Sequence, residues 1–224
     1  MSAGYSLSRR LAAEALGTAF LLMAVVGSGI MGERLSQGND ALALLANSVA
    51  TGCALFVLIL IFLPLSGAHF NPVVTLSMFM RRSLGGKEAL AYVAVQIVAA
   101  VAGVAAAHLM FGEPLFSASA KIRTGWAQWG SEFIAAFGLV LVILGCLRDR
   151  VSAIPAAVAA YITAAYWFTS STSFANPAVT LARALSDTFA GIRPQDAWGF
   201  VLAQIAGGVA AAWLAGWLFS VEDK

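Results

Sequence analysis

The sequence has few charged residues and few of the side chains that hold metals or form cross-links. Of its 224 residues, 11% are charged, two are cysteine and two are histidine. A net charge of +2 gives no basic field for nucleic acid, so we expect no nucleic-acid partner. Cys53 and Cys146 lie inside apolar runs without metal-ligand spacing. They indicate neither a disulfide framework nor a metal site, and we expect no cofactor.

The sequence is rich instead in long apolar segments. Hydrophobic residues make up 60% of the chain, and they gather in blocks of about twenty, the length that crosses a bilayer. A soluble domain could not cover so many blocks, because its outer surface must be wettable. The first block follows basic residues but is long enough to span, so we interpret it as part of the mature protein. The blocks predict an all-α membrane protein with spans at residues 11–31, 41–64, 88–111, 127–147, 153–170 and 196–219.

Two further apolar stretches, at residues 71–80 and 176–186, are too short to cross alone. One begins Asn-Pro-Val-Val-Thr-Leu and the other Asn-Pro-Ala-Val-Thr-Leu. Asparagine is a strong N-cap and proline suits the first helical position, so each stretch predicts an irregular segment that leads into a half-helix. Irregular backbone at membrane depth is tolerated only where it lines a cavity. The permeation site is therefore expected between these two segments.

The duplication extends beyond the half-helices. The surroundings of Glu14 in the first span resemble those of Glu132 in the fourth, and Gln96 in the third corresponds to Gln204 in the sixth. We expect a single channel domain over residues 1–224, with repeats at about residues 8–111 and 127–219. Because each repeat has an odd number of spans, the second enters the membrane inverted, and the half-helices approach from opposite faces.

Basic residues predict the orientation in the membrane. With the N-terminus inside, the inner segments hold more lysine and arginine than the outer ones, mostly in short loops where the positive-inside rule is strongest. We therefore expect both termini in the cytoplasm. The inner set is Arg9, Arg10, Arg81, Arg82, Lys87, Arg148, Arg150 and Lys224. The outer set is Arg34, Lys121, Arg123, Arg183 and Arg193.

These motifs resemble the aquaporin and aquaglyceroporin family over nearly the whole chain. The most specific part is the run Ser-Gly-Ala-His-Phe-Asn-Pro-Val-Val-Thr at residues 66–75, followed about 105 residues later by the second Asn-Pro motif. Glutamates in the first and fourth spans belong to the same pattern. The resemblance implies a right-handed bundle of six helices and two half-helices, with a pore in each protomer. It also implies a homotetramer in membrane lipid.

The half-helices suggest how such a pore selects its solute. Two helix N-termini at the bilayer centre oppose cations where screening is poorest. We expect the amide N–H groups of Asn71 and Asn176 to donate to a passing oxygen, while loop carbonyls accept, which serves a small neutral solute. The expected carbonyls are those of Gly67, Ala68, His69 and Thr172, and the half-helix motifs include Pro72, Val73, Pro177 and Ala178. Glu14 and Glu132 are interpreted as structural carboxylates that accept loop N–H groups.

The filter positions depart from those of water-selective relatives, which use an aromatic residue, a histidine and an arginine there. Counting from the two motifs gives Thr51, Ala164, Ser173 and Val179. All are small and none is charged, so we expect an opening wider than that of a water channel. The pattern resembles bacterial members that pass bulkier neutral solutes, including the trihydroxy form of arsenite. We expect a bacterial inner-membrane channel for metalloid acids first, glycerol second and water incidentally.

Several alternatives stay open at this point. Arg183 follows Val179 by one helical turn, and it is either a vestibule charge or an arginine at the outer surface or a subunit contact. His69 is interpreted through its backbone carbonyl, and pH gating is unsupported. A water-selective aquaporin and a coupled transporter with a midplane site are competing functions. No set of nucleophile, base and oxyanion donor can be assembled, so we expect no enzyme.

Overall fold

The structure is a computed structural model that describes residues 4–220, and within that range it is helical, with no strand. Lys224, assigned above to the inner set, lies outside the described residues. The long helices are α1 (Leu7–Leu35), α2 (Asp40–Ser66), α4 (Gly86–Phe111), α5 (Trp126–Asp149), α6 (Ile154–Phe168) and α8 (Pro194–Leu218). The short elements are α3 (Pro72–Met80), α7 (Pro177–Arg183) and the 3-10 turn η1 (Val151–Ala153), which leads into α6.

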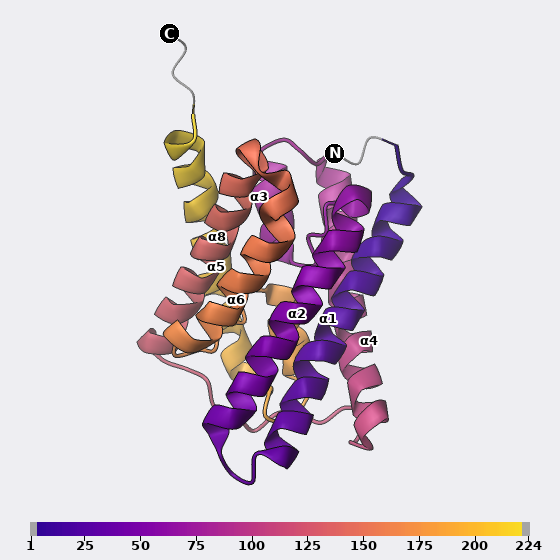
Figure 1. Cartoon of the computed structure of the whole chain (residues 1–224), viewed down its shortest axis with the longest axis vertical. Helices are drawn as coiled ribbons and strands as arrows, with labels where there is room; N and C mark the ends of the chain where they lie inside the picture. The colour runs from indigo at the N-terminus through magenta and orange to yellow at the C-terminus, as the bar shows by residue number, and fades with distance from the viewer. Residues whose placement is uncertain (1–3, 221–224) are drawn as a thin grey trace.

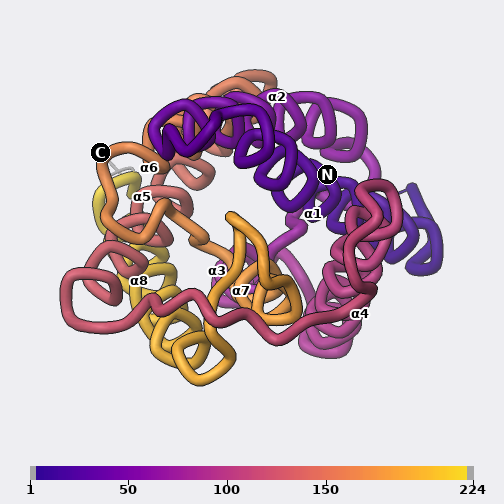
Figure 2. Tube along the Cα trace, turned by 90° about the horizontal axis from the view of Figure 1, so that it is seen from below, coloured from indigo at the N-terminus to yellow at the C-terminus, as the bar shows by residue number. Residues whose placement is uncertain are grey.

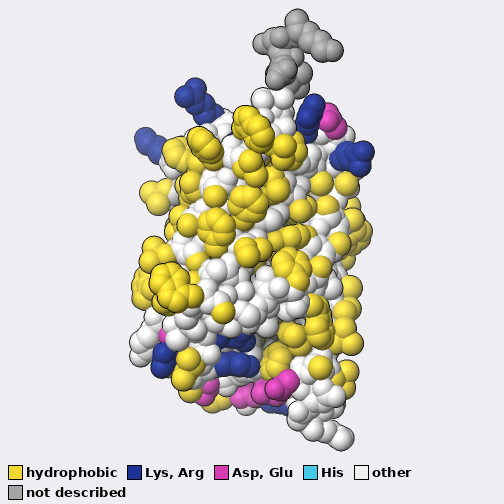
Figure 3. Space-filling model, turned by 90° about the vertical axis from the view of Figure 1, so that its left-hand side faces the viewer, with side chains coloured by type: hydrophobic (Ala, Val, Ile, Leu, Met, Phe, Trp, Pro, Cys, Tyr) yellow, Lys and Arg dark blue, Asp and Glu magenta, His cyan; other side chains and the backbone are white. Residues whose placement is uncertain are grey.

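Six segments are long and apolar enough to cross a membrane, as the sequence predicted: α1, α2, α4, α5, η1 with α6, and α8. The expected spans differ from the helices mainly at their ends, because polar residues extend several helices beyond their apolar blocks. Asn39, for example, accepts a hydrogen bond from the Leu42 backbone N–H and starts α2. Figure 3 shows apolar side chains over the middle of one face and charged side chains at its two ends.

The two half-helices lie inside a ring formed by the long helices (Figures 1 and 2). Helix α1 packs on α4 and α2, and in the same way α5 packs on α8 and α6. The half-helices follow this correspondence, since α3 contacts α4 and α7 contacts α8. Both chain ends lie at the same end of the bundle (Figure 1), which agrees with an even number of spans.

Close approach of paired helices depends on glycines at the crossing points. A methyl group at Gly103 of α4 would overlap the backbone oxygen of Ala19 in α1. A methyl group at Gly207 of α8 would likewise overlap the backbone oxygen of Phe133 in α5. Small residues let helix backbones approach closely in a membrane, where van der Waals packing drives association. These two contacts set the spacing of the wall around the half-helices.

We expect Gly207→Ala to destabilise the bundle by about 1–3 kcal/mol, because α8 must move away from α5 to admit the methyl group. The matched control is Gly130→Ala on α5, where a methyl group meets nothing within 4 Å. Thermal unfolding of the detergent-purified variants measures both effects. Equal melting temperatures for the two variants would contradict the crossing-point assignment.

Candidate functional site

The N-terminus of each half-helix is tied to the loop that precedes the other half-helix. The side-chain Nδ2 of Asn71 donates to the Ala175 carbonyl at 2.8 Å, and Nδ2 of Asn176 donates to the Phe70 carbonyl at 2.8 Å. We had expected the amide N–H groups to be free for solute. The structure corrects this, because one N–H of each amide joins the two halves and only the other remains to face the cavity that both asparagines line.

The asparagine oxygens cap the half-helices. Oδ1 of Asn71 accepts from the Val73 N–H at 2.9 Å, and Oδ1 of Asn176 accepts from the N–H groups of Ala178 and Val179 at 3.0 and 3.3 Å. Pro72 and Pro177 occupy the first helical positions, where no N–H is needed. Two positive helix ends therefore meet beside the cavity, and each is capped by an asparagine whose side chain also lines the cavity.

Val73, which stands where alanine is usual in this motif, is buried on the side of α3 that faces α8. Its side chain occupies the place that a Cβ at Gly208 would need. It packs in a cluster with Met78, Val140 and Ala211, and it is not among the residues that line the cavity. The extra volume of Val73 is therefore accommodated in the wall and leaves the pore unchanged.

Glu14 holds the loop before α3. It is fully buried, and its Oε1 accepts from the His69 N–H at 2.9 Å and from Ser66 Oγ at 2.6 Å. Its Oε2 accepts from the Phe70 N–H at 2.7 Å and from Gln96 Nε2 at 2.8 Å. All these donors belong to the loop or to its neighbouring helices, so this carboxylate acts on the pore through the backbone that it positions.

Glu132 does the same for the loop before α7. Its Oε1 accepts from the Phe174 N–H at 2.9 Å, while its Oε2 accepts from the Ala175 N–H at 2.8 Å and from Gln204 Nε2 at 2.6 Å. The bracing is needed because both loops contain left-handed backbone at residues other than glycine, which is costly in isolation. These residues are Ala68, Phe70, Thr172, Ser173 and Ala175.

We expect Glu132→Gln to destabilise the channel by ~3 kcal/mol, because an amide nitrogen would then face a backbone donor in a buried site. Asp149→Asn is the matched control, since its carboxylate is largely exposed and, among residues 4–220, pairs only with its neighbour Arg148. Thermal unfolding of both variants checks this. A Glu132 variant as stable as the control would remove the bracing role.

A cavity of about 220 Å³ runs past the meeting point of the half-helices. Of the expected carbonyl positions, Gly67, Ala68 and His69 line it and Thr172 does not. Thr51, Ser173 and Val179 line it as well. Thr51 Oγ1 lies 3.1 Å from the hydroxyl of Tyr166, and Ser173 Oγ is buried without a hydrogen-bond partner in the described chain. Most of its other lining residues are aliphatic side chains from α1, α2, α5 and α6.

The prediction that Ala164 belongs to the filter is wrong. Ala164 is exposed on the outside of α6, and the cavity is lined instead by Ile162 and Tyr166. These two residues are one helical turn apart and share a face, whereas Ala164 lies midway between them in sequence and on the opposite side. A fixed count back from Asn176 missed the helical phase of α6. The period of its buried residues could have found Tyr166.

Arg183 is only 2% exposed and lines the cavity, so it does not lie at the outer surface. Its guanidinium carbon is 3.4 Å from the centre of the Phe174 ring, and its Nε donates to the Ala190 carbonyl. This is a cation–π arrangement in a desolvated place. The charge therefore stands beyond Val179 on the same half-helix, at the end of the cavity that Thr51 and Ser173 also line.

Sequence reasoning did not single out Arg123 as a site residue, although it lies near the same ring. Its guanidinium carbon is 5.1 Å from the centre of Phe174, and it donates to the carbonyls of Ser171 and Gly191 at 3.2 and 2.9 Å. Burial lowers the pKa of Arg123. Burial also lowers the pKa of Lys121, which the charges of Arg123 and Arg183 depress further. Three cations thus lie near one another, and of these Arg183 lines the cavity.

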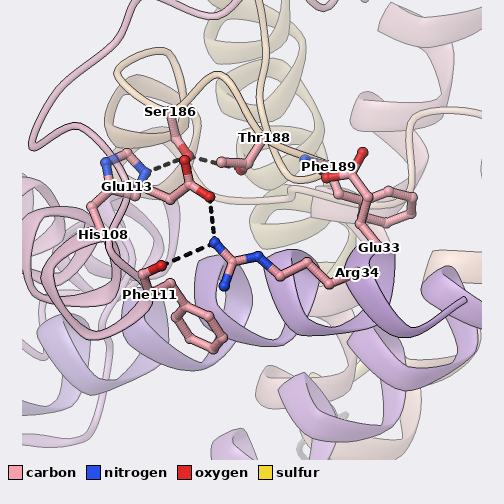
Figure 4. Close-up of polar contacts among 8 residues, drawn as sticks. All are labelled: Glu33, Arg34, His108, Phe111, Glu113, Ser186, Thr188 and Phe189. Carbon is pink, nitrogen blue, oxygen red and sulfur yellow. Dashed lines mark hydrogen bonds and ion pairs between the residues drawn. The ribbon is translucent and has the colours of Figure 1, made fainter.

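Polar contacts fix the segment that follows α7 (Figure 4). His108 Nε2 lies 2.8 Å from Ser186 Oγ, which lies 2.9 Å from Thr188 Oγ1. Nearby, Arg34 donates to Glu113 at 2.8 Å and to the Phe111 carbonyl at 2.9 Å. His108 is therefore a structural link between α4 and this segment. Among residues 4–220, no cluster of histidine, cysteine or acidic side chains could hold a metal.

Six spanning segments around two capped half-helices, with a lined cavity between them, define a helical membrane channel. Comparisons with known proteins agree. The profile of the major intrinsic protein family matches residues 2–172. The chain is 56% identical over 214 residues to aquaglyceroporin AqpS of Rhizobium meliloti (strain 1021), covering 96% of this chain and 91% of AqpS. It is 27% identical to aquaporin NIP1-1 of Oryza sativa subsp. japonica, covering 92% and 72% of the two chains.

A solved structure supports the same fold. The X-ray structure of the aquaglyceroporin from Plasmodium falciparum superposes with a TM-score of 0.77 at 20% identity, covering 93% of this chain and 95% of that one. The chain belongs to the major intrinsic protein family. It is a multi-pass membrane protein and a passive channel, not an enzyme.

The correction at α6 can be tested by adding bulk at two positions. We expect Ile162→Phe to lower glycerol permeability in proteoliposomes by about tenfold, because the ring enters the cavity wall. Ala164→Phe is the matched control and should leave permeability within twofold of the unmodified protein, since its side chain points out of the bundle. A larger effect at residue 164 than at residue 162 would reverse the assignment.

Proposed function

We propose that this protein is a wide-filter channel for small uncharged solutes: neutral arsenite and other metalloid acids, glycerol-sized polyols, and water. The observation that carries the proposal is Val179 on the cavity wall at the filter position, where an arginine would add volume, charge and five N–H donors. The printed name of AqpS, an aquaglyceroporin, supports the polyol part.

The filter chemistry suits a solute with several hydroxyl groups. Ser173 Oγ has no hydrogen-bond partner in the described part of the chain and can donate to or accept from a solute. The paired hydroxyls of Thr51 and Tyr166 present a second polar point. Apolar side chains, mostly aliphatic, make up most of the rest of the wall, so a trihydroxy molecule can turn its oxygens to one side and its apolar or weakly polar face to the other. Ions gain too little from these groups to replace their hydration shell.

The loss of the filter arginine leaves cation rejection to the half-helix dipoles and to Arg183. Arg183 is buried at the end of the cavity, where its charge is weakly screened. Because Arg183 lies one helical turn beyond Val179, its positive charge is separated from the filter at Val179. In this arrangement the opening can be wide while the electrostatic potential at its approach stays positive.

The proposal includes the setting of the channel. We propose a homotetramer in the bacterial inner membrane, with both termini cytoplasmic and one pore in each protomer, built from the repeats at about residues 8–111 and 127–219. The bias of arginine and lysine toward the end that carries the termini supports this orientation. AqpS comes from a bacterium, which supports the cellular setting.

Stopped-flow light scattering on proteoliposomes with water, glycerol and arsenite gradients tests the solute range. We expect all three to move at a rate independent of imposed ion gradients. Val179→Arg should lower glycerol and arsenite permeability by about tenfold or more and retain water permeability, because the guanidinium narrows the opening. Movement of water alone through the unmodified protein would overturn the wide-filter proposal, and dependence on an ion gradient would favour coupled transport.

The role of Arg183 has its own test. We expect Arg183→Ala to raise proton or cation leak through proteoliposomes by about tenfold, because the buried positive charge is lost. Arg193→Ala is the control, since it removes an arginine from the same end of the molecule that is partly exposed and paired with Asp196. An unchanged leak in the Arg183 variant would leave the helix dipoles as the sole barrier.

A further inference from the structure

A second hollow lies on the outside of the bundle, away from the pore. It is an open groove where the C-terminal end of α3 meets the C-terminal end of α8, and its lining includes Arg81, Arg82, Trp213, Trp217 and Ser220. Neither the channel fold nor the proposed transport function uses it. The groove lies at the end of the molecule that carries both termini (Figure 1).

The guanidinium groups of the two arginines in the groove are available to bind an anion. Both are exposed, and neither guanidinium has an acidic or hydrogen-bonding partner within residues 4–220. Arg82 also has a left-handed backbone, with a φ of 58°. This conformation closes α3, since the Ser83 N–H reaches the Met78 carbonyl at 3.0 Å, and glycine is the usual residue there. An arginine at such a position adds a second guanidinium to the groove at the cost of backbone strain.

The opposite wall of the groove is aromatic. Trp213 is 81% exposed and Trp217 is 72% exposed, and they are one turn apart on the same face of α8. Tryptophan is enriched where a membrane-spanning helix meets the headgroup layer, because its ring is apolar and its N–H is polar. Figure 3 shows the side of the molecule on which α5 and α8 lie, with basic side chains at the end near the chain termini, beyond the apolar belt.

We propose that this groove binds the headgroup of an anionic phospholipid. The phosphate is taken by Arg81 and Arg82, whose planar guanidiniums suit phosphate oxygens. The rings of Trp213 and Trp217 lie along the glycerol and upper acyl region of the same lipid. The arginines carry a charge opposite to that of the phosphate, and the tryptophans lie where a spanning helix meets the headgroup layer. Both features therefore favour an anionic headgroup as the occupant. The pore is not involved.

Native mass spectrometry of the full chain, purified in detergent, tests this with phosphatidylglycerol and with phosphatidylcholine of the same acyl chains. We expect phosphatidylglycerol to bind more tightly. The double variant Arg81→Gln/Arg82→Gln should lose more than about tenfold of that affinity and keep its affinity for phosphatidylcholine. The control Arg148→Gln/Arg150→Gln removes two arginines from the same end, outside the groove, and should bind as the unmodified protein does. Retained water permeability shows that the variants are folded.

Three results would overturn the proposal. The first is equal phosphatidylglycerol binding by the groove variant and the unmodified protein, or an equal loss in the control. The second is a changed subunit number in the groove variant with unchanged lipid binding, which would make the groove a contact between copies. The third concerns Glu222 and Asp223, which follow Ser220 closely in sequence. If arginine-dependent lipid binding arises only after residues 221–224 are deleted, the chain's own acidic end is the occupant.

Discussion

Two hydrogen bonds cross between the halves of this protein at the middle of the bundle, from Asn71 to the Ala175 carbonyl and from Asn176 to the Phe70 carbonyl. Each joins a helix start to a loop from the other repeat. Without them, two positive helix ends and two stretches of irregular backbone would face each other with no attraction. The cavity and the caps both depend on this reciprocal exchange, because the asparagines that link the halves also cap the half-helices and line the cavity.

The exchange works only if the two loops present their carbonyls in the right place, and buried glutamates ensure this. Glu14 and Glu132 each accept from two successive backbone N–H groups of a loop. Gln96 and Gln204 complete the carboxylate shells. Left-handed residues in these loops are therefore held by charge-assisted hydrogen bonds inside a low-dielectric bundle, where such bonds are strong. These hydrogen bonds hold the irregular pore backbone in one conformation.

Much of this architecture follows from the sequence because it depends on length and on local chemistry. Apolar blocks of spanning length and Asn-Pro starts predict the six spans and the two half-helices, and these agree with the structure. Thr51, Ser173 and Val179, reached by counting from the two motifs, line the cavity, and their role as the filter stays a prediction.

The remaining site residues depend on packing between distant segments. Ala164 was misplaced because a count along the chain does not give the rotation of α6 about its axis, and Tyr166 was missed with it. Arg123 reaches the pore end through a loop whose path has no sequence periodicity. The burial of Arg183 depends on Phe174 and on the Ala190 carbonyl, which lie on separate segments. The placements of Arg123 and Arg183 are tertiary, so no local pattern predicts them.

Phe174, a neutral residue, helps to position two of the arginine charges near the pore mouth. The backbone N–H of this neutral residue is held by Glu132, while its ring contacts one guanidinium at 3.4 Å and another at 5.1 Å. The ring also meets Phe200 of α8 edge to face at 5.1 Å. The positions of two charges are thus coupled to one aromatic ring and to the helix behind it. Family members with identical ionisable residues could differ in their electric field at the mouth, through changes at uncharged positions alone.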